Sequence, residues 1–309
     1  MKTISILNYK GGVGKTTLTA CTGQALALTG FRVLAIDNDP QHNLSYALGA
    51  GVERPTIRDV YHGSIGIAAQ LFQKSIKKTT LSNLSVVPSS SELCAADIKD
   101  PYLLQKCFAY SSLEHSFDFI LIDNSPGMDL LQESSIHASD EIFVPTELSQ
   151  FAINGICEMR DMLMRRFPDD CSISKIIPNF YRNTKAQDAA IFDLEEHFPG
   201  KVTQTAIPFD SVFDTLVKER KTLFLHRLSS KAAAYYIKLI HELFNLEEEA
   251  TWQMVMEKRK EHISTEARKR FLEQRLERKK KSLQENENLP KEQEVPPPLP
   301  SSPINSQPL

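Results

Sequence analysis

Short apolar runs alternate with longer segments of helical periodicity along most of the chain, from residue 2 to about residue 244. The runs are rich in β-branched residues and apolar at nearly every position, as expected of strands covered on both faces. Crossover helices on a parallel sheet produce this alternation, so the pattern predicts an α/β fold with a doubly wound, mostly parallel sheet flanked by helices. The expected strands are residues 3–8, 32–36, 85–88, 117–122, 141–145, 174–178 and 202–207.

Several segments between these runs predict helices. Apolar residues recur at helical spacing over residues 15–29, 153–166 and 230–245. The first segment ends before Gly30 and the second before Pro168, and both residue types commonly follow a helix. We therefore expect three helices here, within a first domain that covers residues 1–249.

The composition changes after about residue 249. Residues 250–283 are dense in Lys, Arg and Glu, and their few apolar residues, such as Trp252 and Met256, are mostly at helical spacing. This pattern predicts a charged helical extension. Residues 284–309 are proline-rich and lack the apolar surface that would offset the entropy of ordering, so we expect a disordered tail.

Composition and charge narrow the possible classes of protein. Hydrophobic residues make up 41% of the sequence, but no apolar run approaches the roughly 18 residues of a membrane span. The first strand begins at once, without the pattern of a secretory signal, so we expect a cytoplasmic protein. The five cysteines never form the close pairs of a metal or redox motif. The net charge of −3 means that any contact with nucleic acid requires a local basic patch.

A glycine-rich loop with two lysines follows the first strand and precedes the first helix. The glycines allow backbone N–H groups to approach phosphate oxygens, and the partial positive charge of the helix N-terminus adds to the attraction. A lysine at the end of such a loop reaches the β- and γ-phosphates, and the hydroxyl after it can bind Mg²⁺. The predicted phosphate cradle comprises Lys10, Gly11, Gly12, Val13, Gly14, Lys15, Thr16 and Thr17.

Carboxylates follow two of the expected strands. Asp37 and Asp39 come after the second strand, and Asp123 comes after the strand over 117–122. In doubly wound sheets, ligands bind at the edge formed by the carboxyl ends of the strands. Carboxylates at that edge can hold Mg²⁺ or orient an attacking water. The three residues therefore extend the predicted site from phosphate binding to hydrolysis.

The loop departs from the plain P-loop pattern because Tyr9 takes the place of its first glycine. It has instead the form Lys-Gly-Gly-x-Gly-Lys-Thr-Thr, the deviant Walker A loop of the ParA and MinD group. Together with Asp-x-Asp-Pro-Gln at 37–41, the strand ending at Asp123 and the segment 144–147, this loop makes residues 1–246 resemble ParA-type ATPases, which partition plasmids and chromosomes. Two later segments differ from the family's usual Asp-x-Pro-Pro-Ser and Ile-Pro-Arg.

The resemblance implies an ATPase that uses ATP and Mg²⁺ and hydrolyses ATP slowly until a partner stimulates it. Lys10 is implied to reach across a dimer to the phosphates held by the other subunit. Lys15 is implied to bind the phosphates of its own subunit, and Asp39 to position the attacking water, so these three are the implied catalytic residues. The implied metal site comprises Thr16, Asp37 and Asp123, and the implied adenine contacts are Asn179 and Pro208.

The resemblance also implies partners. With ATP, the chain is expected to form a homodimer that binds DNA without sequence preference and associates with the nucleoid. A ParB-like centromere-binding protein is then expected to stimulate hydrolysis and release. The DNA contacts should neutralise phosphates rather than read bases. The candidate residues for these contacts are Arg182, Lys185, Lys218, Arg220, Lys221, Arg227 and Lys231.

Alternatives stay open at this point. A MinD-like ATPase, which cycles on the membrane in division-site placement, shares the loop. The apolar face of residues 250–283 is interrupted, however, so a membrane partner is not expected. The same segment is a rival DNA site, although its interleaved glutamates favour a solvated or partner-binding helix. The nitrogenase iron protein would need a cluster-binding cysteine just beyond Asp123, where none occurs.

Overall fold

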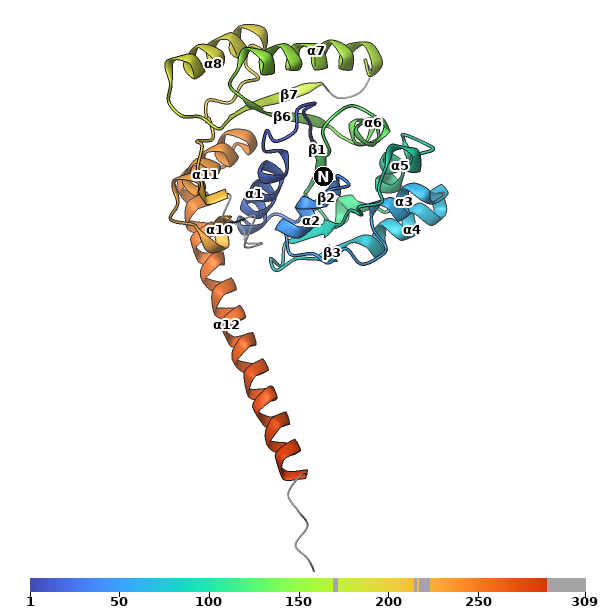
Figure 1. Cartoon of the computed structure of the whole chain (residues 1–309), viewed down its shortest axis with the longest axis vertical. Coiled ribbons are helices and arrows are strands. Elements are labelled where there is room, and N and C mark those ends of the chain that lie inside the picture. Colours follow the sequence, from blue (N-terminus) through green and yellow to red (C-terminus); the bar gives the residue numbers. More distant parts are fainter. Residues whose placement is uncertain (169–171, 214–215, 217–222, 288–309) are drawn as a thin grey trace, which may run out of the picture. The chain divides into compact units, whose positions relative to one another are not determined.

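The computed structural model describes residues 1–168, 172–213, 216 and 223–287. Its strands are β1 (Lys2–Ile6), β2 (Val33–Asn38), β3 (Lys77–Lys78), β4 (Leu84–Val87), β5 (Phe119–Asn124), β6 (Glu141–Glu147) and β7 (Ile173–Asn179). Within the described residues they form one sheet in the order β3-β4-β2-β5-β1-β6-β7 (Figure 1). All neighbouring strands are parallel except β3 and β4, which pair antiparallel at one edge. The predicted doubly wound, mostly parallel sheet is therefore confirmed.

Helices connect the strands. They are α1 (Lys15–Leu28), α2 (Asn43–Ala47), α3 (Ile57–His62), α4 (Ile65–Ser75), α5 (Leu103–Tyr110), α6 (Leu130–His137), α7 (Gln150–Arg166), α8 (Lys185–His197), α10 (Leu223–His226), α11 (Lys231–Phe244) and α12 (Glu248–Glu287), with the short 3-10 helices η1 (Ala95–Asp97) and η2 (Leu113–His115). The three helices expected from periodicity are confirmed as α1, α7 and α11, with small differences at their ends.

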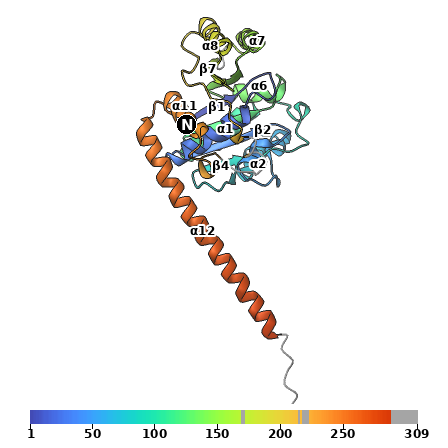
Figure 2. The same cartoon turned by 60° about the vertical axis from the view of Figure 1, so that its left-hand side comes forward.

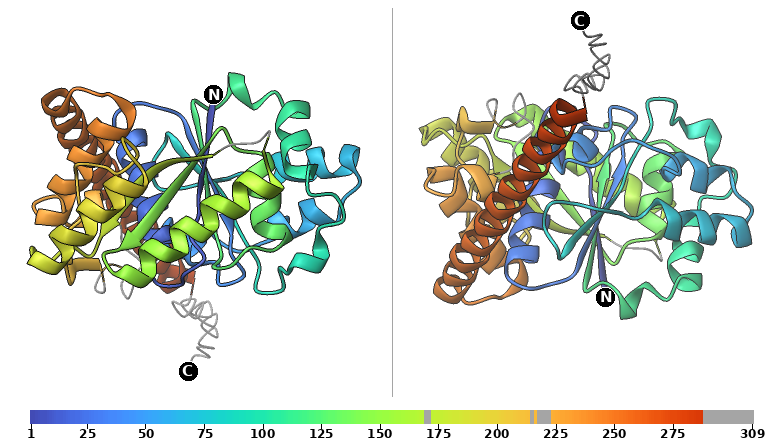
Figure 3. Two further views of the ribbon diagram at one scale, coloured as in Figure 1. Left: turned by 90° about the horizontal axis from the view of Figure 1, so that it is seen from above. Right: turned by 90° about the horizontal axis from the view of Figure 1, so that it is seen from below.

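Successive residues of β2 point to opposite faces of the sheet and enter different cores. Val33 and Ala35 belong to a cluster with α1, α10 and α11, whereas Leu34 and Ile36 belong to a cluster with α3, α4 and α5. Figure 2 shows α1 beside the sheet, where it also contacts α11. A third cluster joins β6 and β7 to α7 and α8, which lie side by side (Figure 3). Coverage of both faces explains why the strands are apolar at nearly every position.

The strand expected over 202–207 is wrong. This segment makes isolated bridges to the sheet only near its two ends. Between them, the backbone N–H groups of Gln204 and Thr205 donate to the Glu242 carboxylate of α11, at 2.6 and 2.9 Å. The neighbouring strand β7 contributes Pro178, which has no N–H to donate. The ladder is therefore interrupted, because a side chain of α11 takes the donors that a strand partner would need.

The first turns of α12 pack on the core that contains α1. Thr251 and Val255 are buried, and Trp252 packs against the same cluster. The guanidinium Nε of Arg259 donates to the Leu225 carbonyl at 3.1 Å. The beginning of α12 is therefore part of the packed structure rather than a separate helix.

The chain divides after His262 into two compact units, and α12 is helical as far as Glu287. The predicted domain boundary at residue 249 stays a prediction. Most of the expected disordered tail, residues 288–309, lies outside the described residues. In the part of the chain that the structure describes, no helix has both the length and the apolarity needed to cross a bilayer.

Candidate functional site

The loop between β1 and α1 has a shape that requires glycine at two points. Gly12 and Gly14 have φ values of 75° and 94°, in the left-handed region that side chains disfavour. A Cβ atom at Gly14 would lie 2.3 Å from Nδ2 of Asn179, so even alanine would clash there. Gly14 is also the N-cap of α1. The N–H groups of the first turn of this helix therefore lie next to the loop and can bind an anion.

Lys15 is buried although it carries an ammonium group. Its Nζ donates to the backbone carbonyls of Asn8 at 3.1 Å and Lys10 at 2.9 Å, so the loop folds around it. Burial lowers the pKa of Lys15, and the carboxylates of Asp123 and Asp39 partly offset that effect. A phosphate in the loop would place further negative charge beside a cation that has lost most of its water.

Asp37 and Asp123 lie in register on the adjacent strands β2 and β5, and both are fully buried. The N–H and the hydroxyl of Ser45 donate to Oδ2 of Asp37 at 2.7 and 2.6 Å. Burial nevertheless raises the pKa of Asp37 to about 6. Burial, together with repulsion from Asp37, raises the pKa of Asp123 well above its usual range. A cation next to this pair would therefore stabilise both carboxylates.

One oxygen of the pair is available to a cation. Oδ2 of Asp123 is buried and has no hydrogen-bond partner among the described residues. The Thr16 hydroxyl interacts with the same carboxylate and partly offsets the rise in its pKa. Within the described chain, no three His, Cys, Asp or Glu side chains converge closely enough to hold a metal by themselves. The Thr16 hydroxyl and the carboxylates of Asp37 and Asp123 suit Mg²⁺, because this ion commonly takes one or two carboxylates and completes its shell with phosphate oxygens and water.

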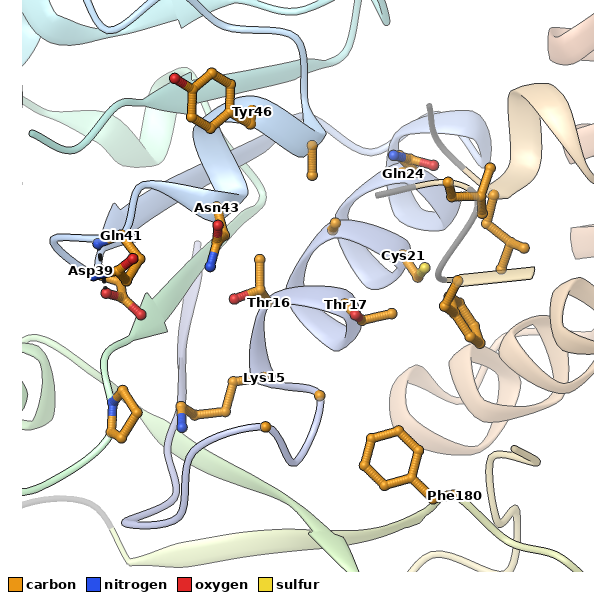
Figure 4. Close-up of a pocket in the computed structure, with 18 residues that line it drawn as sticks. Lys15, Thr16, Thr17, Cys21, Gln24, Asp39, Gln41, Asn43, Tyr46 and Phe180 are labelled. Carbon is orange, nitrogen blue, oxygen red and sulfur yellow. Dashed lines mark hydrogen bonds between the residues drawn. The ribbon is translucent and has the colours of Figure 1, made fainter. Parts of the chain in front are cut away.

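A cavity of about 610 Å³ opens beside the loop. Figure 4 shows Lys15, Thr16 and Asp39 facing it, and α2 lines a further side. Asp39 is only 8% exposed, and its Oδ1 accepts a hydrogen bond from the N–H of Gln41 at 2.9 Å. The cavity is as large as typical small-molecule sites, which occupy about 300 to 1,000 Å³.

Asn179 lies against the loop at the end of β7. Its Nδ2 donates to the Val13 carbonyl at 2.8 Å, and its Oδ1 accepts from the N–H of Phe180 at 2.9 Å. Phe180 has a φ of 56°, which is uncommon for a bulky residue, and it lines the cavity. Pro208 forms a backbone bridge with Tyr181 nearby. Adenine contacts by Asn179 and Pro208 stay a prediction.

Lys10 is engaged by its own chain. Its Nζ forms an ion pair of 2.5 Å with Glu147, the last residue of β6. The Ser149 hydroxyl donates to the same carboxylate oxygen at 3.0 Å. The hydrogen bond from Lys10 holds the pKa of Glu147 below its ordinary value. Any role of Lys10 on another subunit would therefore require this ion pair to open.

The candidate DNA contacts are described only in part. Arg182 is exposed, and its guanidinium lies over the ring of Phe209, 3.7 Å from the centroid. Lys185 at the start of α8, Arg227 after α10 and Lys231 at the start of α11 are exposed as well. These residues stay candidates. Three others lie outside the described residues: Lys218, Arg220 and Lys221.

Sequence reasoning missed three contributors to the site. Ser45 binds Asp37 from eight positions away, and no pattern in the sequence signals that contact. Phe180 follows the strand-ending Asn179, and its place after a strand could have drawn attention to it. Glu147 belongs to a segment that the sequence did single out, but its ion pair depends on β6 lying beside β1.

Comparisons with known proteins identify relatives of this chain. A family model described as an AAA domain matches residues 1–167, which include the loop and all three carboxylates. The chain is 29% identical over 250 residues to the sporulation initiation inhibitor protein Soj of Bacillus subtilis, covering 78% of this chain and 98% of that protein. It is 30% identical over 260 residues to the chromosome partitioning protein ParA of Caulobacter vibrioides, covering 80% of this chain and 95% of that protein.

A solved structure supports the same comparison. The septum site-determining protein MinD of Pyrococcus horikoshii, complexed with Mg-ADP, superimposes with a TM-score of 0.65 at 28% identity. The superposition covers 78% of this chain and 95% of MinD. The relatives therefore match nearly over their full length, while about a fifth of this chain extends beyond the match.

The raised pKa of Asp37 predicts that folding depends on pH. Asp37 titrates near pH 6 in the folded chain, against an ordinary value of 3.8, so the unfolded chain loses its proton first as pH rises. Between pH 5 and pH 7.5 this group should lower the free energy of unfolding by about 1 kcal/mol. Asp37→Asn should remove that part of the dependence, as measured by urea unfolding at a series of pH values.

The matched control for this experiment is Asp161→Asn, which changes an exposed carboxylate of α7 paired with Arg160. It should keep the pH dependence of the wild type. An Asp37→Asn variant with the same pH dependence as the wild type would show that Asp37 does not titrate in this range.

Proposed function

We propose that this chain, which belongs to the ParA/MinD family of P-loop ATPases, is an ATP-driven switch that partitions a plasmid or a chromosome. One observation carries the proposal. A single edge of the sheet gathers the glycine-rich loop, the buried Lys15 and the carboxylates of Asp37, Asp39 and Asp123 beside one cavity. Phosphate binding and water activation need these groups together.

ATP is the expected ligand of the cavity. The N–H groups of the loop donate to phosphate oxygens in this proposal, and Lys15 exchanges its bonds to two carbonyls for bonds to phosphates. Thr16 would hold Mg²⁺, with Asp37 and Asp123 behind it, and the bound ion would supply positive charge that stabilises the phosphates. The MinD relative solved with Mg-ADP supports both ligands.

Asp39 is the residue proposed to act in hydrolysis. It lines the cavity, and its hydrogen bond from Gln41 fixes one carboxylate oxygen. The other oxygen can orient a water for attack on the γ-phosphorus. As the new P–O bond forms, the bond to the β,γ-bridging oxygen breaks, and ADP and phosphate are released.

Lys10 connects nucleotide binding to dimerisation in this proposal. In the single chain its ammonium group is paired with Glu147. In an ATP-bound homodimer, Lys10 leaves that partner and contacts the phosphates held by the other subunit. The ion pair is largely exposed, so opening it costs little, about 1 kcal/mol or less. The phosphates of a second subunit then outcompete one carboxylate.

The proposed DNA and protein partners of this chain are suggested by its relatives. Soj and ParA, at 29% and 30% identity, are named for sporulation control and chromosome partitioning. In this chain, the ATP-bound homodimer is proposed to bind DNA without sequence preference and to stay on the nucleoid. A ParB-like centromere-binding partner stimulates hydrolysis, and the ADP-bound chains separate and release the DNA.

A MinD-like cycle on the membrane is the second candidate, and the likeness to MinD favours it. The two candidates share ATP binding and dimerisation. They differ in what the ATP-bound dimer binds, a duplex of random sequence or a vesicle of anionic lipid.

Lys15→Ala should weaken Mg-ATP binding at least about a hundredfold, because it removes the buried ammonium that phosphate oxygens would share. Isothermal titration calorimetry measures the Kd. Lys106→Ala is the matched control, since it removes an exposed lysine of α5 that pairs with Asp100, and it should bind like the wild type. Unchanged affinity in Lys15→Ala would exclude the loop as the phosphate site.

Asp39→Ala should bind ATP within about threefold of the wild type but hydrolyse it at least about a hundredfold more slowly, because positioning the water contributes mainly to the transition state. Asp39→Asn, which can still accept from Gln41, should behave alike, since it also lacks the charge. Single-turnover hydrolysis measures the rate. Normal turnover in both variants would remove Asp39 from the mechanism.

Glu147→Gln should favour the ATP-bound dimer, because it weakens the intramolecular partner of Lys10. The dimer dissociation constant should fall by about two- to fivefold, which is the size of a surface ion pair. Sedimentation equilibrium with ATP and Mg²⁺ measures it. Glu141→Gln is the control: it breaks the ion pair between Glu141, at the start of β6, and Lys2 of β1, and it should leave the constant unchanged. A weaker dimer in Glu147→Gln would mean that Glu147 supports the dimer instead.

A further inference from the structure

Positive charge is concentrated in one segment of an otherwise acidic chain. Residues 263–283 contain eight Lys and Arg against three Glu, a net charge of +5, whereas the whole chain carries −3. The remainder therefore carries −8. A polyanion is repelled by the net field of the remainder and attracted by this segment.

Three successive cations of this segment are available for binding. Residues 268–270, Arg-Lys-Arg, are exposed in α12, and they form no ion pair among the described residues. By contrast, two cations of the basic triplet at 258–260 already have partners within the chain. Lys258 pairs with Glu261 at 2.9 Å, and Arg259 donates to the Leu225 carbonyl at 3.1 Å. Arg268, Lys269 and Arg270 therefore have N–H donors left for an anionic partner within the described part of the chain.

The cations surround the helix instead of forming a stripe. Three successive residues of an α-helix span about 200° of its circumference. The triplet at 268–270 therefore points positive charge to nearly opposite sides at one level. Ten residues further on, the sequence has another basic cluster at 278–281. This arrangement suits a partner that flanks the helix on more than one side.

The two exposed large apolar residues that the structure describes in this segment do not share a face. Ile263 and Leu272 are both exposed, and nine positions separate them. At about 100° per residue they point to opposite sides of the helix. A helix that lies in a lipid interface, or that pairs in a coiled coil, needs a continuous apolar face. A membrane surface would also contact only one side of the helix, and the cations on the opposite side would face water.

The major groove of B-form DNA has the required shape. It is about 12 Å wide, accepts an α-helix and is bordered by phosphates on both sides. The corresponding groove of A-form RNA is too narrow for side chains to enter. Lys and Arg contact phosphates without reading sequence. Shape and charge therefore favour duplex DNA over RNA or lipid.

We infer that the part of α12 around residues 268–270 is a non-specific DNA-binding element that holds duplex phosphates through the exposed side chains of Arg268, Lys269 and Arg270. The inference rests on the proposed function and assigns its DNA contact to this helix. The exposed core cations Arg182, Lys185 and Arg227 are then dispensable for affinity.

The test is a variant in which Arg268, Lys269 and Arg270 are all replaced by Gln, a good helix former that removes charge without breaking the helix. Binding of the full-length chain to a fluorescent duplex of random sequence is measured by anisotropy at 0.1 M salt, with and without ATP and Mg²⁺. Affinity should fall at least about tenfold. The slope of log K against log salt should decrease by about one for each phosphate that the variant no longer neutralises.

The matched control replaces Lys74, Lys77 and Lys78 by Gln, which removes the same charge from the end of α4 and from β3. This control should bind DNA within about twofold of the wild type. Circular dichroism of both variants checks that the helix content is unchanged. A second variant, with Arg182, Lys185 and Arg227 replaced by Gln, tests the core residues directly and should also bind normally.

The outcomes separate this inference from the proposed function. If the wild type binds DNA with ATP and the 268–270 variant binds equally well, the assignment to α12 is wrong while the partition switch stands. If only the core variant loses binding, the DNA surface lies on the core. If the wild type binds ATP and dimerises but prefers phosphatidylserine vesicles to DNA, both the inference and the DNA partner are wrong.

Discussion

The burial of two neighbouring carboxylates, Asp37 and Asp123, is the constraint on which the rest of the site depends. Removing a carboxylate from water is costly unless hydrogen bonds or positive charge replace its hydration. The chain meets part of that cost through Ser45, which donates twice to Asp37, and through the ammonium of Lys15 nearby. Oδ2 of Asp123 is left without a hydrogen-bond partner in the described structure. Burial of this carboxylate pair therefore carries a free-energy cost, which a cation and its anionic ligand would lower.

The sheet topology makes this arrangement possible. Strand β5 lies between β2 and β1, so the two aspartates and the glycine-rich loop reach the same edge from three adjacent strands. The strand β6, on the other side of β1, brings Glu147 to Lys10. The end of β7 brings Asn179 to the loop backbone. Parallel strands joined by crossover helices thus collect residues that are far apart in the sequence.

Local sequence patterns predicted the parts of the site whose geometry is local. The loop could be recognised because the residues that shape it, Gly12, Gly14 and Lys15, lie within a few positions of one another in the sequence. The aspartates could be placed because parallel strands end at one edge. The ion pair between Lys10 and Glu147 could not be predicted, since it depends on which strands are neighbours. The strand expected over 202–207 was wrong because periodicity does not show that Glu242 competes for its N–H groups.

The packing at the start of α12 connects this helix to α1. Val255 is fully buried in the cluster that also holds α1, and the Cε of Met254 would lie 3.8 Å from a Cβ at Gly30, just past the end of α1. The start of α12 is therefore held by the same packed cluster that contains α1. Such a layer resists small displacements because its side chains are close-packed. A displacement at the start of α12 would therefore reach the layer packed against α1, the helix that begins at the glycine-rich loop.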